Sequence, residues 1–202
     1  MHRLLDVALR VADRGSAAAA IAGGVLIFAS ALLVSFDVTT RKLFNFTLGG
    51  ADELSGYALA IGSAWAFAFV LLNRGNVRID VLYQHLPRSG AALCDIAAIL
   101  ALLSFVGVTA WYGWGVFAHS WVLAARSNSA LGVPLWIPQG LWWLGYAWLL
   151  VCGALLLSRG IGLLLARDFD GVHRLLGARS VVDEAADELA HARQSRKDSA
   201  AP

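Results

Sequence analysis

The stretch SAAAAIAGGVLIFASALLVSF, residues 16–36, decides which class of fold this chain adopts. All 21 of its residues are apolar or small, and none is charged. A helix of this length rises about 30 Å, which matches the hydrocarbon core of a bilayer. The run is also longer than the apolar core of a cleavable signal peptide, which has about 7–15 residues. We therefore predict a retained membrane-spanning helix.

Three further apolar stretches are long enough to cross a bilayer. The chain of 202 residues is 58% hydrophobic and only 15% charged, and its mean hydropathy is +0.65. These values are too apolar for an ordinary soluble domain. We predict an all-α membrane protein with four transmembrane helices, over residues 16–36, 54–72, 91–118 and 136–158.

The predicted spans divide the chain into three parts. Residues 1–15 form an N-terminal amphipathic segment, residues 16–158 the transmembrane domain, and residues 159–202 a C-terminal tail. In the first part, charged residues recur at helical spacing, at Arg3, Asp6, Arg10 and Asp13. Apolar residues occupy another side, so this segment is predicted to be a helix lying in the membrane interface.

Basic residues lie mostly on one side of the predicted spans. Thirteen of the sixteen Lys and Arg residues fall in the N-terminal flank, the second connection or the tail. The three others are Arg41, Lys42 and Arg126. Because cytoplasmic segments carry the excess of Lys and Arg, both termini are predicted to be cytoplasmic. The small net charge of +2 does not indicate a nucleic-acid partner.

Six of the eight tryptophans gather around the third connection, at the other face of the predicted membrane domain. They are Trp111, Trp114, Trp121, Trp136, Trp142 and Trp143. Tryptophan is enriched where lipid meets water, so we expect an aromatic belt there, whose simplest role is anchoring. Docking of a partner is the alternative.

The spans carry no pattern of catalytic or cofactor-binding residues. Acidic residues lie at or near span ends, and the interiors hold little beyond the hydroxyls of Ser30, Ser63, Ser104 and Thr109. None of the five histidines lies deep in a span, so the paired axial ligands of a haem cytochrome are missing. GxSxG, HExxH and P-loop motifs are absent as well. We predict no enzyme activity, no cofactor and no metal.

The two cysteines lack the spacing of a metal or redox site. Cys94 and Cys152 both lie inside apolar segments, with no CxxC motif. We expect both to be buried small residues without a disulfide.

Small residues give the predicted span 54–72 two narrow faces. One is formed by Gly56, Ala60, Ala64 and Ala68, and the other by Ala58, Gly62 and Ala66. Small residues let helix backbones approach closely in lipid. Packing inside the chain's own bundle explains them most simply, and contact of one face with another protein is the alternative.

The segment NRGNVRIDVL, residues 73–82, interrupts the apolar sequence with charges. An isolated strand beside the membrane would leave backbone groups unpaired, so an interfacial helix is the better interpretation. Arg74 and Arg78 would then lie at the anionic membrane surface. This arrangement serves orientation alone or also braces a partner, with Asp80 as an ion-pair candidate.

Four motifs, taken with their order, resemble the small membrane subunit of tripartite ATP-independent periplasmic (TRAP) transporters. They are Arg41 followed by Phe44 and Asn45, then GGADELSGY at 49–57, NRGNVRIDVLYQHLP at 73–87 and LGVPLWIPQG at 131–140. The likeness covers roughly residues 25–160. The family often has His at the position of Asn76, so an ionisable ring is absent there.

The resemblance implies an accessory role in the bacterial inner membrane. The partners would be a large permease subunit, which carries the substrate and sodium sites, and a periplasmic binding protein that delivers an organic acid. The candidate residues for contact with a partner are Arg41, Asp52, Glu53, Gly56, Ala60, Ala64, Arg74, Arg78 and Asp80.

Two other classes of function stay open on the residues alone. A small autonomous channel or exporter would need a polar path through the membrane, and the spans show none. A membrane anchor of a redox complex would be revealed by its absorbance spectrum.

Overall fold

The computed structural model describes residues 2–75 and 86–177, which form five helices and no strand. Four of them are long and apolar enough to cross a membrane. This confirms the predicted all-α class with four spans. The helices are α1 His2–Phe44, α2 Ala51–Leu72, α4 Arg88–Val122, α5 Trp136–Leu165 and the short α6 Phe169–Leu176.

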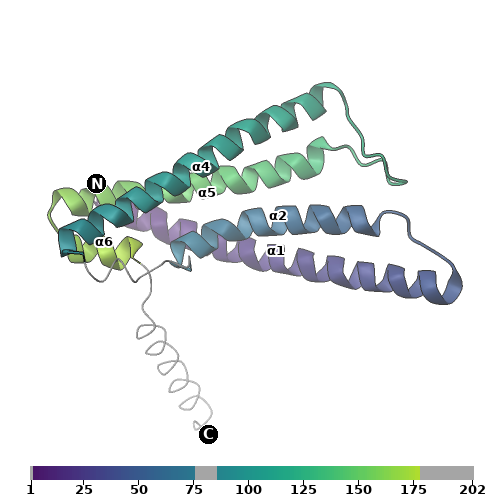
Figure 1. The fold of residues 1–202 in the computed structure, drawn as a ribbon, viewed down its shortest axis with the longest axis horizontal. Coiled ribbons are helices and arrows are strands. Elements are labelled where there is room, and N and C mark those ends of the chain that lie inside the picture. Colours follow the sequence, from purple (N-terminus) through teal and green to yellow (C-terminus); the bar gives the residue numbers. More distant parts are fainter. Residues whose placement is uncertain (1, 76–85, 178–202) are drawn as a thin grey trace, which may run out of the picture.

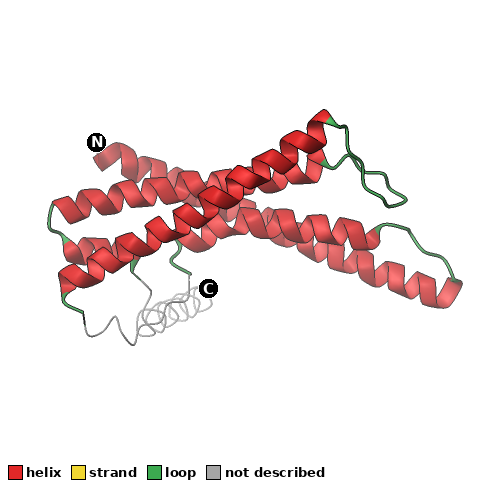
Figure 2. Ribbon diagram, turned by 45° about the horizontal axis from the view of Figure 1, so that its top comes forward, coloured by secondary structure: helices red, strands yellow, loops and turns green. Residues whose placement is uncertain are grey.

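The long helices form two antiparallel pairs, α1 with α2 and α4 with α5 (Figure 1). The pairs join through contacts between α2 and α5. Figures 1 and 2 both show the pairs diverging toward the connections 45–50 and 123–135, a side that we call the loop end. The opposite side, where α1 begins and α6 lies, is the terminal end.

α1 runs without a break through the boundary that we predicted at residue 15. At 1.5 Å per residue its 43 residues extend about 65 Å, well beyond the 40–45 Å of a bilayer with its headgroups. Ala12 and Ser16 are buried, and the Ser16 hydroxyl accepts a hydrogen bond from Nε1 of Trp148 on α5. Residues 2–15 are therefore the first part of α1, because packing on the bundle continues through them.

Three helices end in the same hydrogen-bonded turn. After α2, Gly75 N donates to Val70 O and Arg74 N donates to Leu71 O, which is the Schellman pattern. The left-handed position of this turn usually takes glycine, but here it holds Arg74, and after α4 and α5 it holds Ala124 and Arg167. Such a residue costs of order 1–3 kcal/mol.

α6 closes the terminal end of the bundle. Its first turn is capped by Asp168, whose Oδ1 accepts from Gly171 N at 2.8 Å. Val172 and Leu176 are buried in the apolar core shared with α4 and α5. α6 is thus an amphipathic helix whose apolar side packs across these two helices.

Candidate partner interface

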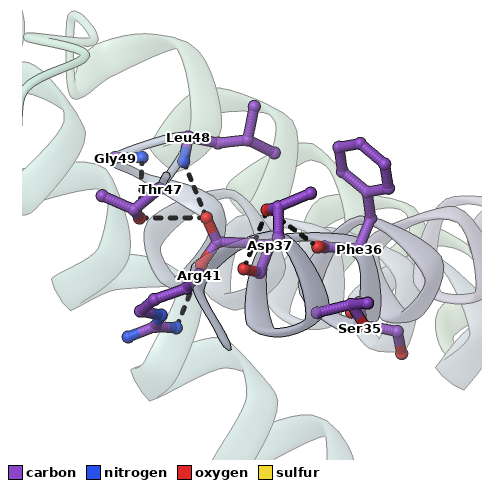
Figure 3. Close-up of polar contacts among 9 residues, drawn as sticks. Ser35, Phe36, Asp37, Arg41, Thr47, Leu48 and Gly49 are labelled. Atoms are coloured by element: carbon purple, nitrogen blue, oxygen red, sulfur yellow. Dashed lines mark hydrogen bonds and ion pairs between the residues drawn. The ribbon is translucent and has the colours of Figure 1, made fainter. Parts of the chain in front are cut away.

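Asp37 is a buried carboxylate near the loop end of α1. Its Oδ1 accepts from Leu48 N at 2.7 Å and from Thr47 Oγ1 at 3.0 Å, and its Oδ2 accepts from Arg41 Nη2 at 3.0 Å (Figure 3). A buried charge is costly unless it is paired and hydrogen-bonded. These three donors satisfy that requirement and fasten the connection 45–50 to the end of α1.

Arg41, one of the predicted contact residues, therefore pairs with a carboxylate of its own chain. It lies one turn after Asp37 on α1, and its side chain is 55% exposed. Its guanidinium has five donor N–H groups, and within the described residues only Nη2 makes a hydrogen bond. At this exposure a partner can reach the rest of the side chain.

The predicted acidic pair at the start of α2 divides into two different environments. Asp52 is exposed, whereas Glu53 is half-buried. Tyr57 donates its hydroxyl hydrogen bond to Glu53 Oε1. The other oxygen of Glu53, Oε2, is buried and has no hydrogen-bond partner within the described residues.

Both narrow faces of α2 pack within the bundle. A Cβ added to Gly62 would lie 2.8 Å from the carbonyl oxygen of Gly23 on α1. On the other face, Ala64 is buried against Gly145 of α5. A Cβ added to Gly145 would lie 2.9 Å from the Ala64 Cβ. These contacts use the small residues to bring backbones together.

The three small residues that we predicted for a partner contact differ in exposure. Ala64 is buried, Ala60 is half-buried, and Gly56 is exposed. A Cβ added to Gly56 would have no neighbour within 4 Å. Contact of Gly56 with another protein stays a prediction.

The second connection contains the other predicted contact residues. Arg74 follows α2 directly and is half-buried. Within the described part of the chain its guanidinium makes no hydrogen bond or ion pair. Arg78, Asp80 and Asn76 lie outside the described residues, as does most of the predicted interfacial helix, so their roles stay predictions.

The terminal end holds ion pairs between helices that the sequence did not indicate. Nδ1 of His173 on α6 lies 3.5 Å from Oδ2 of Asp95 on α4, and the Asp95 side chain is fully buried. The Arg159 guanidinium on α5 lies 3.2 Å from Asp6 of α1. The sequence shows only that Asp95 is a carboxylate among apolar residues. Nothing in it pairs Asp95 with a histidine so far along the chain.

A further ion pair joins the start of α4 to α6. Arg88 Nη1 and Asp170 Oδ2 are 3.0 Å apart. Both side chains are well exposed, so this pair contributes about 0–1 kcal/mol. The contact at Asp95 joins the same two helices, whereas the pair at Asp6 joins α1 to α5.

The tryptophans gather at the loop end as the sequence predicted. The Trp121 and Trp136 rings meet edge to face with their centroids 4.7 Å apart, and those of Trp114 and Trp143 are 4.9 Å apart. Trp111 is 77% exposed. The cluster joins α4 to α5 and still presents aromatic rings outward, as an interfacial belt requires.

The cysteine prediction is right for one residue and wrong for the other. Cys152 is buried and lies 3.8 Å from the Ser16 hydroxyl. Cys94 is exposed, because it is on the outer side of α4. Within the described residues, no three His, Cys, Asp or Glu side chains are grouped as metal ligands.

The structure is a helical bundle with contact surfaces. One comparison with known proteins identifies the family of the chain. The model of the family described as "Tripartite ATP-independent periplasmic transporters, DctQ component" matches residues 30–162. This match spans more than half of the chain, including α2, α4, most of α5 and about the last third of α1. The chain belongs to the DctQ family.

Comparison with curated proteins gives no match. The resemblance on which the sequence analysis relied is confirmed by the DctQ match, which names a component of a transporter and not an enzyme. The first part of α1 and all of α6 lie outside the matched residues.

Proposed function

We propose that this chain is the accessory scaffold subunit of a TRAP transporter in the bacterial inner membrane. A large permease subunit carries the solute and sodium sites and moves against the scaffold that this chain helps to form. A periplasmic binding protein delivers the solute, which we propose to be an organic acid. Membership of the DctQ family supports the assembly.

The local satisfaction of the span hydroxyls carries this proposal. Ser30 donates to Ile27 O at 2.7 Å, Ser104 to Leu100 O at 2.8 Å and Thr109 to Phe105 O at 3.0 Å. Ser63 also donates within its own helix, to Leu59 O. Hydroxyls paired in this way offer no row of polar groups to an ion or solute. Transport therefore needs the second membrane subunit.

α1 supplies the most extensive free face for that subunit. In its most apolar stretch of 18 residues, only 6% is buried inside the structure. The corresponding share is 28–33% for the other three spans. One exposed stripe combines small and large residues at spacings of four and three, at Ala18, Ala22, Val25, Ala29, Leu32 and Phe36. Such spacing keeps one side of a helix toward a neighbouring helix, and the alanines permit close approach.

A matched pair of substitutions tests this face. Ala29→Trp adds bulk to the exposed stripe of α1, and Ala101→Trp adds the same bulk to an exposed position of α4. Overpacking costs about 1–3 kcal/mol, so recovery of the co-expressed large subunit with Ala29→Trp is expected to fall at least about fivefold. Ala101→Trp is expected to recover it like the wild type. Equal recovery with both variants, or loss only with Ala101→Trp, contradicts contact through α1.

Reconstitution tests the division of labour. Proteoliposomes that hold both membrane subunits, with the binding protein outside and an inward sodium gradient, are expected to take up a labelled organic acid. Proteoliposomes that hold either membrane subunit alone are not expected to take up the acid. Uptake by this chain alone would overturn the accessory role.

A further inference from the structure

Glu53, at the loop end of α2, is a carboxylate that no basic side chain neutralises within the described residues. It makes no ion pair there. Three basic residues lie at the same end of the bundle. Arg41 is paired with Asp37, and neither Lys42 nor Arg126 forms an ion pair with a described residue.

The two carboxylates at the loop end are treated differently by the fold. Asp37 receives three hydrogen bonds, one of them from the Arg41 guanidinium. Glu53 accepts from the Tyr57 hydroxyl on Oε1, while its Oε2 is buried without a hydrogen-bond partner among the described residues. Asp52 begins the same helix and therefore meets the same helix dipole, but it is exposed to solvent. A carboxylate shielded from water needs a partner of opposite charge, and Glu53 lacks one in its own described chain.

A hollow of about 170 Å³ lies beside Glu53, between the first turns of α2 and α5. Tyr57, which holds the Glu53 carboxylate, forms part of its wall, and so does Gln139 of α5. Oε1 of Gln139 is a second buried oxygen without a hydrogen-bond partner in the described structure. Both unpaired atoms are acceptors, so the occupant that suits this place is a donor of hydrogen bonds.

The lining of the hollow favours a basic side chain over a metal ion. A hard cation such as Ca²⁺ takes about six to eight oxygen ligands, whereas most of this wall is carbon, from Ala60, Ile61, Leu135 and Pro138. Lysine and arginine bury an apolar stem and present a charged donor at its tip. The rings of Tyr57 and Trp142, which also line the hollow, attract such a cation as well.

The depth of the hollow indicates which partner supplies that side chain. α2 has 22 residues and is therefore about 33 Å long, close to the thickness of the hydrocarbon core. Ile61 lies about 15 Å from the start of this helix, near its middle. The occupant therefore approaches within the membrane, where a soluble binding protein does not enter.

We propose that the hollow receives an arginine or lysine side chain of the large membrane subunit, which pairs with Glu53. This inference rests on the proposed function, in which that subunit is the membrane partner. Glu53 and Gln139 would then accept hydrogen bonds from one cationic group, and the charge that this chain leaves unpaired would be neutralised across the interface.

A pair of isosteric substitutions tests the contact. Glu53→Gln removes the charge and keeps an oxygen for the Tyr57 hydroxyl, so recovery of the co-expressed large subunit in detergent is expected to fall at least about tenfold. Asp52→Asn removes a charge from the neighbouring, exposed position and is expected to recover it like the wild type. Equal recovery with the two variants overturns the inference.

Thermal unfolding of the purified chain without partners separates binding from folding. Because Glu53→Gln removes a charge without a counterion, its melting temperature is expected to equal or exceed that of the wild type. A lower melting temperature would show that Glu53 supports the chain's own fold, and it would overturn the inference even if recovery of the large subunit fell.

A charge exchange tests the identity of the occupant. Glu53→Arg is expected to abolish recovery of the large subunit, and changing one basic residue of that subunit to glutamate is expected to restore it. If no such change restores recovery after each basic residue of its spans and span ends is tried, the inference is wrong. Failure of the wild type to recover the large subunit would overturn the proposed function too, whereas full recovery by Glu53→Gln overturns this inference alone.

Discussion

The Asp37 carboxylate receives donors from two parts of the chain, the last turns of α1 and the connection 45–50. One of these donors is a backbone N–H, that of Leu48, which has no other partner among the described residues. The donors belong to exposed residues, so removal of this buried acceptor costs the hydrogen bonds to the charged carboxylate themselves. The shape of this connection therefore depends on one side chain.

Asp37→Ala is expected to lower the free energy of unfolding by about 1.5–3 kcal/mol, the contribution of a hydrogen bond to a charged group. Thermal unfolding in detergent measures the change. Asp52→Ala, at an exposed carboxylate, is expected to stay within about 0.5 kcal/mol of the wild type. An unchanged melting curve for Asp37→Ala would show that the connection is held by other contacts.

Arg78 and Asp80 stay predicted contacts with the large subunit. We expect Arg78→Ala and Asp80→Ala each to reduce recovery of that subunit, because breaking a buried pair costs about 3–5 kcal/mol. Arg78→Lys keeps the charge but lacks the planar fork, so it is expected to weaken a specific contact and to leave simple orientation unchanged. Full recovery of the large subunit with both alanine variants would show that this segment only orients the chain in the membrane.

At the scale of the helices, glycine and alanine set which pairs can approach. α1 meets α2 where Gly23 and Gly62 face each other, and α5 meets α2 at Gly145. Tryptophans add polar ties between helices, as Trp65 Nε1 of α2 donates to Leu141 O of α5 at 3.0 Å. In lipid, where apolar burial does not favour one neighbour over another, such contacts decide the pairing.

Adjacent glycines of α1 provide an internal control for this pairing. A Cβ at Gly23 would lie 2.8 Å from the backbone oxygen of Gly62, whereas one at Gly24 would have nothing within 4 Å. Gly23→Ala is expected to destabilise the protein by about 1–3 kcal/mol. Gly24→Ala is expected to be neutral or stabilising, since alanine favours a helix over glycine by about 1 kcal/mol. Equal melting temperatures for the two variants would contradict a close α1–α2 contact.

At the scale of the whole molecule, the two ends of the bundle differ. The terminal end is tied by α6 and by ion pairs that join different helices. The loop end is where the two pairs diverge (Figure 1). A bundle fastened at one end suits a rigid scaffold against which another subunit moves.

The orientation of the bundle is predicted from its basic residues. A reporter fused after Pro202 is expected to be cytoplasmic, and one inserted near Asn128 is expected to be periplasmic, because thirteen of the sixteen Lys and Arg residues lie on the side of the termini. Alkaline phosphatase and green fluorescent protein fusions report the two sides. The opposite pattern would reverse the topology and place Arg74 in the outer leaflet.

The sequence alone determined the spans and the class of protein. Whether a stretch such as 16–36 crosses a bilayer depends on its length and on the transfer of its own side chains into lipid, which are local properties. The lack of charge inside the spans is equally local, and it argues against a polar path for an ion or solute. The order of short motifs was enough to indicate the family.

Only the tertiary structure decided which residues meet. Sequence placed Ala64 among candidates for a partner contact, and the fold buries it against Gly145. It likewise paired Asp95 with His173 and placed Arg74 in a small hollow with Ile99 and Leu156. These outcomes depend on which helices are neighbours and on their rotation about their axes. Neither is encoded in one helix, because both arise from close packing between segments far apart in the chain.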